Sequence, residues 1–114
     1  MYLTENIALA NKKTNQVKMD LDAFSEAAEC LKILAHPHRL MIVQMLLSGR
    51  KYTVGELCER CGITQPQTSD HLRLMQRCGF LRSEREGRSV YYEVCEPHLQ
   101  DFIQCIENRF GKTG

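Results

Sequence analysis

The chain has 114 residues, of which 43% are hydrophobic and 25% charged, and its formal net charge is +1. Such values are typical of one globular domain. They argue against a membrane protein, because no apolar run approaches the roughly 18 residues that a spanning helix needs. The first twenty residues are polar and do not resemble a signal peptide. We therefore expect a cytoplasmic protein whose six cysteines are free, structural, metal-binding or redox-sensing.

Residues 1–20 lack a strong periodicity and are expected to form a flexible arm, with one folded domain over residues 21–112. The first helix begins after Asp20 or Asp22, either of which can cap it. Its apolar residues recur at helical spacing, at Phe24, Ala27, Ala28, Leu31, Leu34 and Ala35. Pro37 ends this helix and can occupy the first turn of the next.

The second helix is almost wholly apolar and is therefore predicted to lie at the centre of the fold. Its apolar residues are Leu40, Ile42, Val43, Met45, Leu46 and Leu47. Thr53 and Glu56 predict a capping box at the start of a third helix, and Gly62 the turn that follows it. One stripe of that helix holds Val54, Leu57, Cys58 and Cys61.

A fourth helix is predicted from Thr64, its N-cap, to Gly79, with Leu72 and Met75 facing inward. Two short strands around Glu86-Gly87 follow, and the second shows the alternation expected of a strand. A last helix is expected from Glu96-Pro97 onward. Its predicted inward residues are Leu99, Phe102, Ile103, Ile106 and Phe110.

The fourth helix and the hairpin after it have the layout of a winged helix-turn-helix, in which one helix enters the major groove of DNA. Gln can pair with adenine, Arg with guanine or phosphate, and Asp can accept from cytosine. The candidate DNA contacts are Gln65, Gln67, Thr68, Ser69, Asp70, His71, Arg73, Arg77, Arg85 and Arg88. A solvated helix face is the alternative. His71 can instead be a packed histidine, Asp70 a local cap, and Arg88 a partner of Glu86.

Bulk charge does not support strong DNA binding. Between residues 64 and 94, five arginines face four acidic residues, which again leaves +1. Affinity would therefore depend on where the arginines lie, and a dimer would double the phosphate contacts.

Four stretches together resemble the ArsR/SmtB family of bacterial winged-helix repressors, over about residues 22–110. They are Leu31-Lys-Ile-Leu-Ala-His-Pro-His-Arg-Leu40, Val54-Gly-Glu-Leu57, Gln65-Pro-Gln-Thr-Ser-Asp-His-Leu72 and Arg85-Glu-Gly-Arg-Ser-Val-Tyr-Tyr92. The resemblance implies a mainly α fold of about five helices with a two-stranded wing. It also implies a homodimer joined through the first and last helices. Such a dimer binds double-stranded operator DNA and leaves it when a metal ion, metalloid or oxidant reaches a sensor site.

No sensor pattern of the family is complete in this chain. Thr53 and Gly55 stand where the arsenic and cadmium type has its Cys-x-Cys, and Gln44 stands where the persulfide type has a cysteine. The zinc type is matched at Glu96 and His98. The rest of its site falls near Arg109 and Lys112, which cannot bind zinc.

The cysteines offer two further hypotheses. Cys58 and Cys61 form a Cys-x-x-Cys, but both lie on an apolar stripe, which favours core packing over zinc or redox chemistry. Cys30 and Cys105 lie on the flanks of the two helices expected at the dimer interface, and Cys95 is expected to open the last helix. We therefore consider an interfacial sensor site drawn from Cys30, Cys95, Cys105 and His98, with a soft metal ion or trivalent arsenic as inducer and no resident cofactor. Ordinary thiols are the alternative.

A transcriptional repressor, not an enzyme, is thus the function that the sequence favours. The alternative is a winged-helix protein-interaction module or a non-sensing DNA binder. A thiol oxidoreductase is disfavoured because Cys58 and Cys61 lack a βαβ context.

Overall fold

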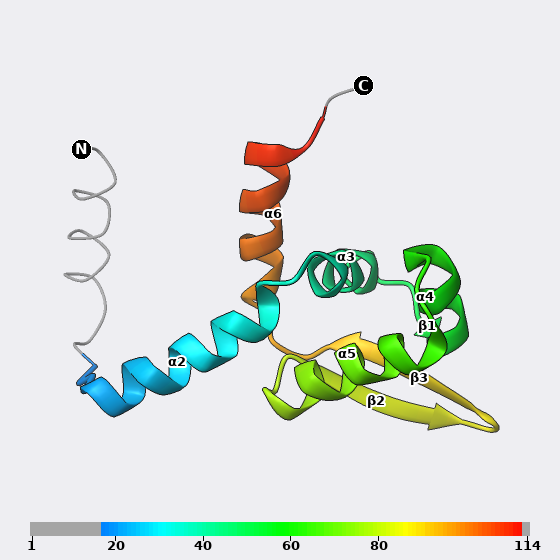
Figure 1. The fold of residues 1–114 in the computed structure, drawn as a ribbon, viewed down its shortest axis with the longest axis horizontal. Helices are drawn as coiled ribbons and strands as arrows, with labels where there is room; N and C mark the ends of the chain where they lie inside the picture. Colours follow the sequence, from blue (N-terminus) through cyan, green and yellow to red (C-terminus); the bar gives the residue numbers. More distant parts are fainter. Residues whose placement is uncertain (1–16, 113–114) are drawn as a thin grey trace.

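The computed structural model describes residues 17–112, so most of the predicted N-terminal arm, residues 1–16, lies outside the described part. The elements in chain order are α2 (Leu21–Leu34), α3 (Pro37–Leu46), β1 (Tyr52–Thr53), α4 (Val54–Cys61), α5 (Gln65–Arg77), β2 (Leu81–Glu86), β3 (Ser89–Val94) and α6 (Leu99–Phe110). Residues 17–112 thus form five helices and one small sheet (Figure 1). This confirms the predicted mainly α fold with a β wing.

Helices α2, α4 and α5 begin at the capping side chains that were predicted, whereas α6 begins at Leu99, after the predicted Glu96-Pro97. The carboxylate of Asp20 accepts the N–H of Ala23 at 2.9 Å and caps α2. Pro37 occupies the first turn of α3. At α4 the side chain of Thr53 accepts the N–H of Glu56, whose carboxylate accepts the N–H of Thr53 in return. Local polar chemistry therefore sets these boundaries.

The sheet has one strand more than the two that the sequence predicts. β1 pairs antiparallel with β3, with Tyr52 opposite Tyr92 and Thr53 opposite Tyr91, and the strand order is β1-β3-β2. β2 and β3 form the wing around a two-residue turn, where Gly87 has a φ of +62°. The prediction missed β1 because a two-residue strand carries no periodicity and its partner lies far along the chain.

The hydrophobic core lies between α3, α4 and α5 and the base of the sheet. Its fully buried side chains come from all three helices and from the first residue of β2. They are Ile42, Val43, Leu57, Leu72, Met75 and Leu81. The inward orientation predicted for Leu72 and Met75 is confirmed.

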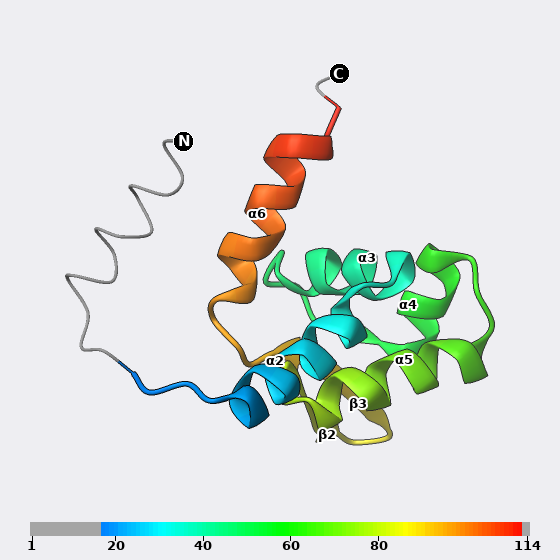
Figure 2. The same cartoon turned by 60° about the vertical axis from the view of Figure 1, so that its left-hand side comes forward.

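Helices α2 and α6 project from this core in two different views (Figures 1 and 2). The inward orientation predicted for Phe102 and Phe110 on α6 is wrong, since their side chains are 41% and 70% exposed. On α2, Phe24 and Leu31, which recur at helical spacing, are 57% and 56% exposed. Each helix has apolar residues on a face that no other described element covers, and helical spacing alone does not separate that face from the core face.

Within residues 17–112, no helix has the length and apolar character needed to cross a bilayer.

Candidate nucleic-acid interface

The N-terminus of α5 is held by its own polar side chains. Thr64 accepts the N–H of Gln67 at 3.2 Å, and the amide oxygen of Gln67 accepts the N–H of Thr64 at 3.0 Å. The sequence predicts Gln67 as a base contact and misses this reciprocal cap. Its oxygen is engaged, so the amide NH₂ group is what remains for a base. Gln65, two residues earlier, is exposed.

Thr68 is a correction to the predicted contact set. Its side chain is 0% exposed, and its hydroxyl donates to the backbone oxygen of Thr64 at 2.9 Å. Thr68 lies one turn before Leu72 on the buried face, so it cannot offer its side chain to a groove. Ser69, next to it, is half-buried.

Asp70 and Arg73 form an ion pair on the exposed face of α5. The carboxylate lies 3.2 Å from the guanidinium, and the two side chains are 70% and 64% exposed. Such an exposed pair is weak, so a phosphate or a base edge can compete for Arg73. The acidic residue thus has a local partner one turn along the helix.

His71 links α5 to α3. Its Nδ1 atom accepts a hydrogen bond from Nε of Arg39 at 3.0 Å, and the ring is half-buried. Burial lowers the pKa of His71, and the neighbouring His36 and Arg39 lower it further. These contacts support the packed role that the sequence leaves open for this residue.

The wing is attached to α5 and to the loop before β1. The amide of Gln76 on α5 donates to the hydroxyl of Ser83 on β2 at 3.2 Å. Lys51 lies 2.6 Å from the carboxylate of Glu86, so Glu86 pairs with Lys51 rather than with Arg88. Both contacts fix the direction in which the hairpin extends.

Several arginines of α5 and the wing remain unpaired within residues 17–112, although the net charge of residues 64–94 is only +1. Three of the four acidic residues counted in this region are paired, namely Asp70, Glu86 and Glu93. In the described part of the chain, no ion pair engages Arg77, Arg85 or Arg88. These three guanidinium groups, at the end of α5 and on the wing, remain available to phosphates.

The Cys-x-x-Cys on α4 has the surroundings of a packed pair. The thiol of Cys58 donates to the backbone oxygen of Ile63 at 2.8 Å. Cys61 packs against the core, and burial, followed by the nearby Cys58, raises its pKa. The raised pKa of Cys61 opposes the thiolate form that zinc binding or redox catalysis uses.

The four predicted sensor residues are not brought together within one chain. Cys95 directly follows β3 instead of opening α6, since the helix begins only at Leu99, after a turn. The thiol of Cys95 donates to the backbone oxygen of Gly79 at 3.2 Å. His98 is exposed, and its ring lies 3.3 Å from the carboxylate of Glu96.

Cys30 on α2 has a neighbour that the sequence did not indicate. Burial raises the pKa of Cys78, at the end of α5, and a hydrogen bond with Cys30 raises it further. Cys105 is exposed on α6.

Among residues 17–112, the potential metal ligands that do converge are His36, His38 and His71. Sequence reasoning missed this cluster because His71 lies far from the other two along the chain.

A capped helix with an exposed polar face, set against a wing with unpaired arginines, defines a winged helix-turn-helix DNA-binding protein. A family model described as a helix-turn-helix domain matches residues 34–84. The chain is 33% identical over 86 residues to the biofilm growth-associated repressor of Xylella fastidiosa, covering 75% of each chain. The chain belongs to the ArsR/SmtB family of helix-turn-helix transcriptional regulators, which are not enzymes.

Two further comparisons extend this result. The chain is 36% identical over 76 residues to a probable mercury resistance operon repressor of Streptomyces lividans, covering 67% of this chain and 60% of the relative. The structure of reduced HlyU from Vibrio cholerae superimposes with a TM-score of 0.70 at 27% identity, covering 80% of this chain and 95% of that one.

Proposed function

We propose that this protein is a homodimeric repressor that binds an operator with two half-sites and releases it in response to a thiol-reactive signal. The observation that carries the proposal is the surface shared by α5 and the wing. Gln65 and Arg73 are exposed on α5, where Ser69 is half-buried, and Arg85 and Arg88 are exposed on the hairpin. Base-reading and phosphate-binding groups thus occur on two elements that contact one another, α5 and β2.

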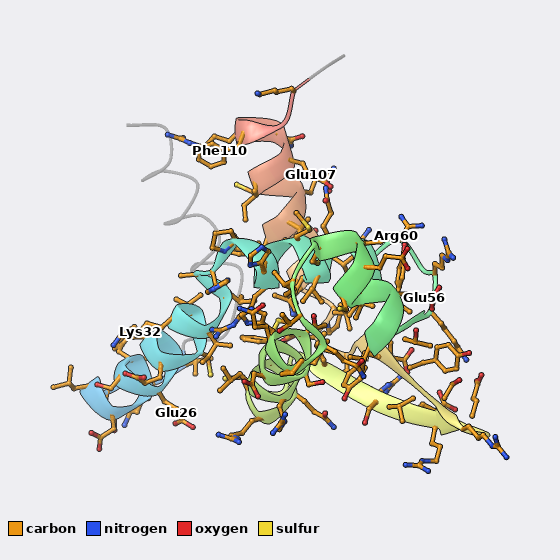
Figure 3. All side chains as sticks on the ribbon, turned by 45° about the vertical axis from the view of Figure 1, so that its right-hand side comes forward. Glu26, Lys32, Glu56, Arg60, Glu107 and Phe110 are labelled. Atoms are coloured by element: carbon orange, nitrogen blue, oxygen red, sulfur yellow. The ribbon has the colours of Figure 1, made fainter. Side chains whose placement is uncertain are left out.

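The exposed apolar faces of α2 and α6 support the homodimer. Large apolar side chains stay uncovered on both helices, and such side chains are typical of surfaces that bind another protein. Phe110 lies near the far end of α6 (Figure 3), well away from the core. A second copy of the chain offers the same faces, which suits a two-fold interface. It would also place two copies of α5 at one operator.

The nature of the signal is supported by the thiols and by the relatives. Cys30 lies on α2 and Cys105 on α6, so these two thiols lie on the helices of the proposed dimer interface, and Cys95 is exposed between β3 and α6. The Streptomyces lividans relative is named for mercury resistance, and one structural neighbour is described as a reduced form. Mercury, trivalent arsenic and oxidants all react with thiolates. We propose Cys30, Cys95 and Cys105 as the sensing cysteines, with His98 as an additional ligand.

DNA binding is tested by the salt dependence of operator affinity. The operator fragment is selected from random duplexes, and the dissociation constant is measured between low and physiological salt. Arg85→Gln and Arg88→Gln should each lower the salt slope by about one unit per protomer. Lys18→Gln, at an exposed position before α2, removes the same charge away from α5 and the wing and is the matched control. A protein-interaction module would show no salt-dependent binding to any duplex, and that result would refute the proposal.

The signal is tested on the protein–operator complex. Cys30→Ser, Cys95→Ser and Cys105→Ser are each titrated with Hg²⁺, trivalent arsenic and hydrogen peroxide while DNA release is followed. At least one variant should need a much higher concentration for release than the wild type. Cys61→Ser, which changes a half-buried thiol, is the control. Equal release from all three variants would exclude these cysteines as sensors.

A further inference from the structure

Three histidines meet where the start of α3 touches α5. His36 and His38 flank Pro37, and His71 comes from the middle of α5. One nitrogen atom from each ring lies within 4.8 Å of the others, and all three side chains are half-buried. The ring centroids are 4.6 Å apart for His36 and His71, 5.6 Å for His36 and His38, and 6.1 Å for His38 and His71.

Two of the three rings are held in place by hydrogen bonds. Nδ1 of His36 accepts the N–H of His38 at 3.2 Å, which caps α3, and Pro37 fixes the backbone between them. Nδ1 of His71 accepts from Arg39, which also donates to the backbone oxygen of Ile33 at 3.0 Å. In the described chain the ring of His38 makes no hydrogen bond, so it is free to turn toward the other two.

The chemistry of this cluster fits a divalent ion of intermediate softness. Neutral imidazole is the commonest metal ligand in proteins, and burial lowers the pKa of both His36 and His71 toward that neutral form. The guanidinium of Arg39 opposes an incoming cation, whereas Asp70, beside His71, favours it. Three imidazole nitrogens leave a fourth position for water, which is a common arrangement around zinc.

We propose that His36, His38 and His71 bind one divalent transition-metal ion of the Zn²⁺, Co²⁺ or Ni²⁺ class. With Zn–N bonds of about 2.0–2.1 Å, the ligand nitrogens of a tetrahedral site lie about 3.3 Å apart. The rings must therefore close by up to about 1.5 Å from their present positions. Side-chain rotation supplies such a shift, most easily at His38. The site contains no cysteine and is separate from the sensing cysteines proposed above.

Metal binding here excludes the hydrogen bond between Arg39 and His71 and, for the same reason, the bond that Nδ1 of His36 accepts from the N–H of His38. A neutral imidazole has a single in-plane lone pair, and in the structure Nδ1 of His71 uses it to accept from Arg39. Binding through Nδ1 takes that lone pair directly. Binding through Nε2 requires the proton to sit on Nδ1, which then cannot accept. An ion at this site thus replaces a link between α3 and α5 with a new one through the metal.

The site is tested with Co²⁺ as a spectroscopic probe on the full chain under reducing, oxygen-free conditions. Wild-type protein should bind one Co²⁺ at this site with nitrogen-type d–d bands and without a sulfur-to-cobalt charge-transfer band. His38→Ala removes the ring that makes no hydrogen bond, so the fold should persist while the affinity falls at least about tenfold. A charge-transfer band in place of the nitrogen-type spectrum, or unchanged affinity in His38→Ala, overturns the proposal.

His98→Ala separates the cluster from the remaining histidine of the chain. Loss of the nitrogen-type spectrum in this variant, with its retention in His38→Ala, would assign the ion elsewhere. Imidazole NMR signals give an independent readout, because Zn²⁺ should shift those of His36, His38 and His71. The Nδ1 signal of His71 should also no longer show that this atom accepts the hydrogen bond from Arg39. Unmoved ring signals at saturating Zn²⁺ would refute the site.

Discussion

The core formed by α3, α4, α5 and the sheet differs from the projecting helices α2 and α6 in how much of its apolar surface is buried within one chain. In the core, Ile42, Leu57 and Leu72 are 0% exposed, and every buried side-chain polar atom in the described residues has a hydrogen-bond partner. On α2 and α6, Phe24 and Phe110 stay more than half exposed. The core is thus complete within one chain, whereas the projecting helices present apolar surface that a partner could cover.

Charged substitutions on the exposed apolar faces of α2 and α6 should have the largest effect on operator affinity. Phe24→Glu or Phe110→Glu places a charge on an apolar face, so the proposed dimer should dissociate, as measured by sedimentation. Operator affinity should then fall by about 10²–10⁴-fold, because the second half-site no longer adds avidity. Gln100→Glu adds the same charge to α6 at an exposed polar position and should leave both properties unchanged. A wild-type protein that sediments as a monomer would contradict this view of the two regions.

Equal truncations in the two regions should cost different amounts of stability. Leu72→Ala should lower the free energy of unfolding by about 2–5 kcal/mol, since its side chain is fully buried. Leu31→Ala, at 56% exposure, should cost less than about 1 kcal/mol. Both are measured by urea unfolding in the Phe110→Glu background, which removes any contribution from dimerisation. Similar costs at the two positions would show that α2 is packed as tightly as the core.

Helix caps provide a finer comparison. Thr64→Ala should destabilise the whole fold by about 1 kcal/mol, because α5 contributes to the core. Asp20→Ala should instead open the first turn of α2 locally. Amide hydrogen exchange then rises near Ala23 while the global unfolding energy changes little. Equal global losses in the two variants would argue against independent behaviour of α2.

The smallest effect concerns pH. Hydrogen bonds from the backbone and side chain of Thr53 hold the pKa of Glu56 below its ordinary value of 4.5. The folded chain therefore binds this proton less readily than the unfolded chain. The stabilisation is present above pH 4.5 and is lost as the pH falls through the folded-state pKa. Glu56→Gln should make unfolding less dependent on pH in the acid range, and Glu59→Gln, outside the capping box, should not. Identical acid profiles for both variants would contradict the assignment.

Features set by neighbours in sequence could be predicted. The capping box of Thr53 with Glu56, the left-handed turn at Gly62 and the burial of Leu72 all follow from short-range patterns. The fold class and the position of α5 follow from these. The exposed polar face of α5 was also predicted, except at Thr68, which was counted as a DNA contact although its i, i+4 spacing from Leu72 places it on the buried face.

Features set by contacts between distant segments could not be predicted. Strand β1 depends on its pairing with β3, and the exposure of Phe102 and Phe110 depends on which elements reach α6. Helical periodicity identifies an apolar face, but it does not show whether the core of the same chain covers that face. The histidine cluster likewise depends on the packing of α3 against α5.

Thr53 ends β1 and is also the N-cap of α4, so no linker separates the sheet from the helix-turn-helix. With Gln76 tied to Ser83 as well, the wing and α5 cannot shift independently. In the proposed dimer, each protomer thus contributes one unit whose length from α5 to the wing is fixed. The proposed inducer would then change the angle between the two units but not the length of either. Inserting or deleting base pairs between the half-sites should therefore imitate the inducer more closely than any change within a half-site.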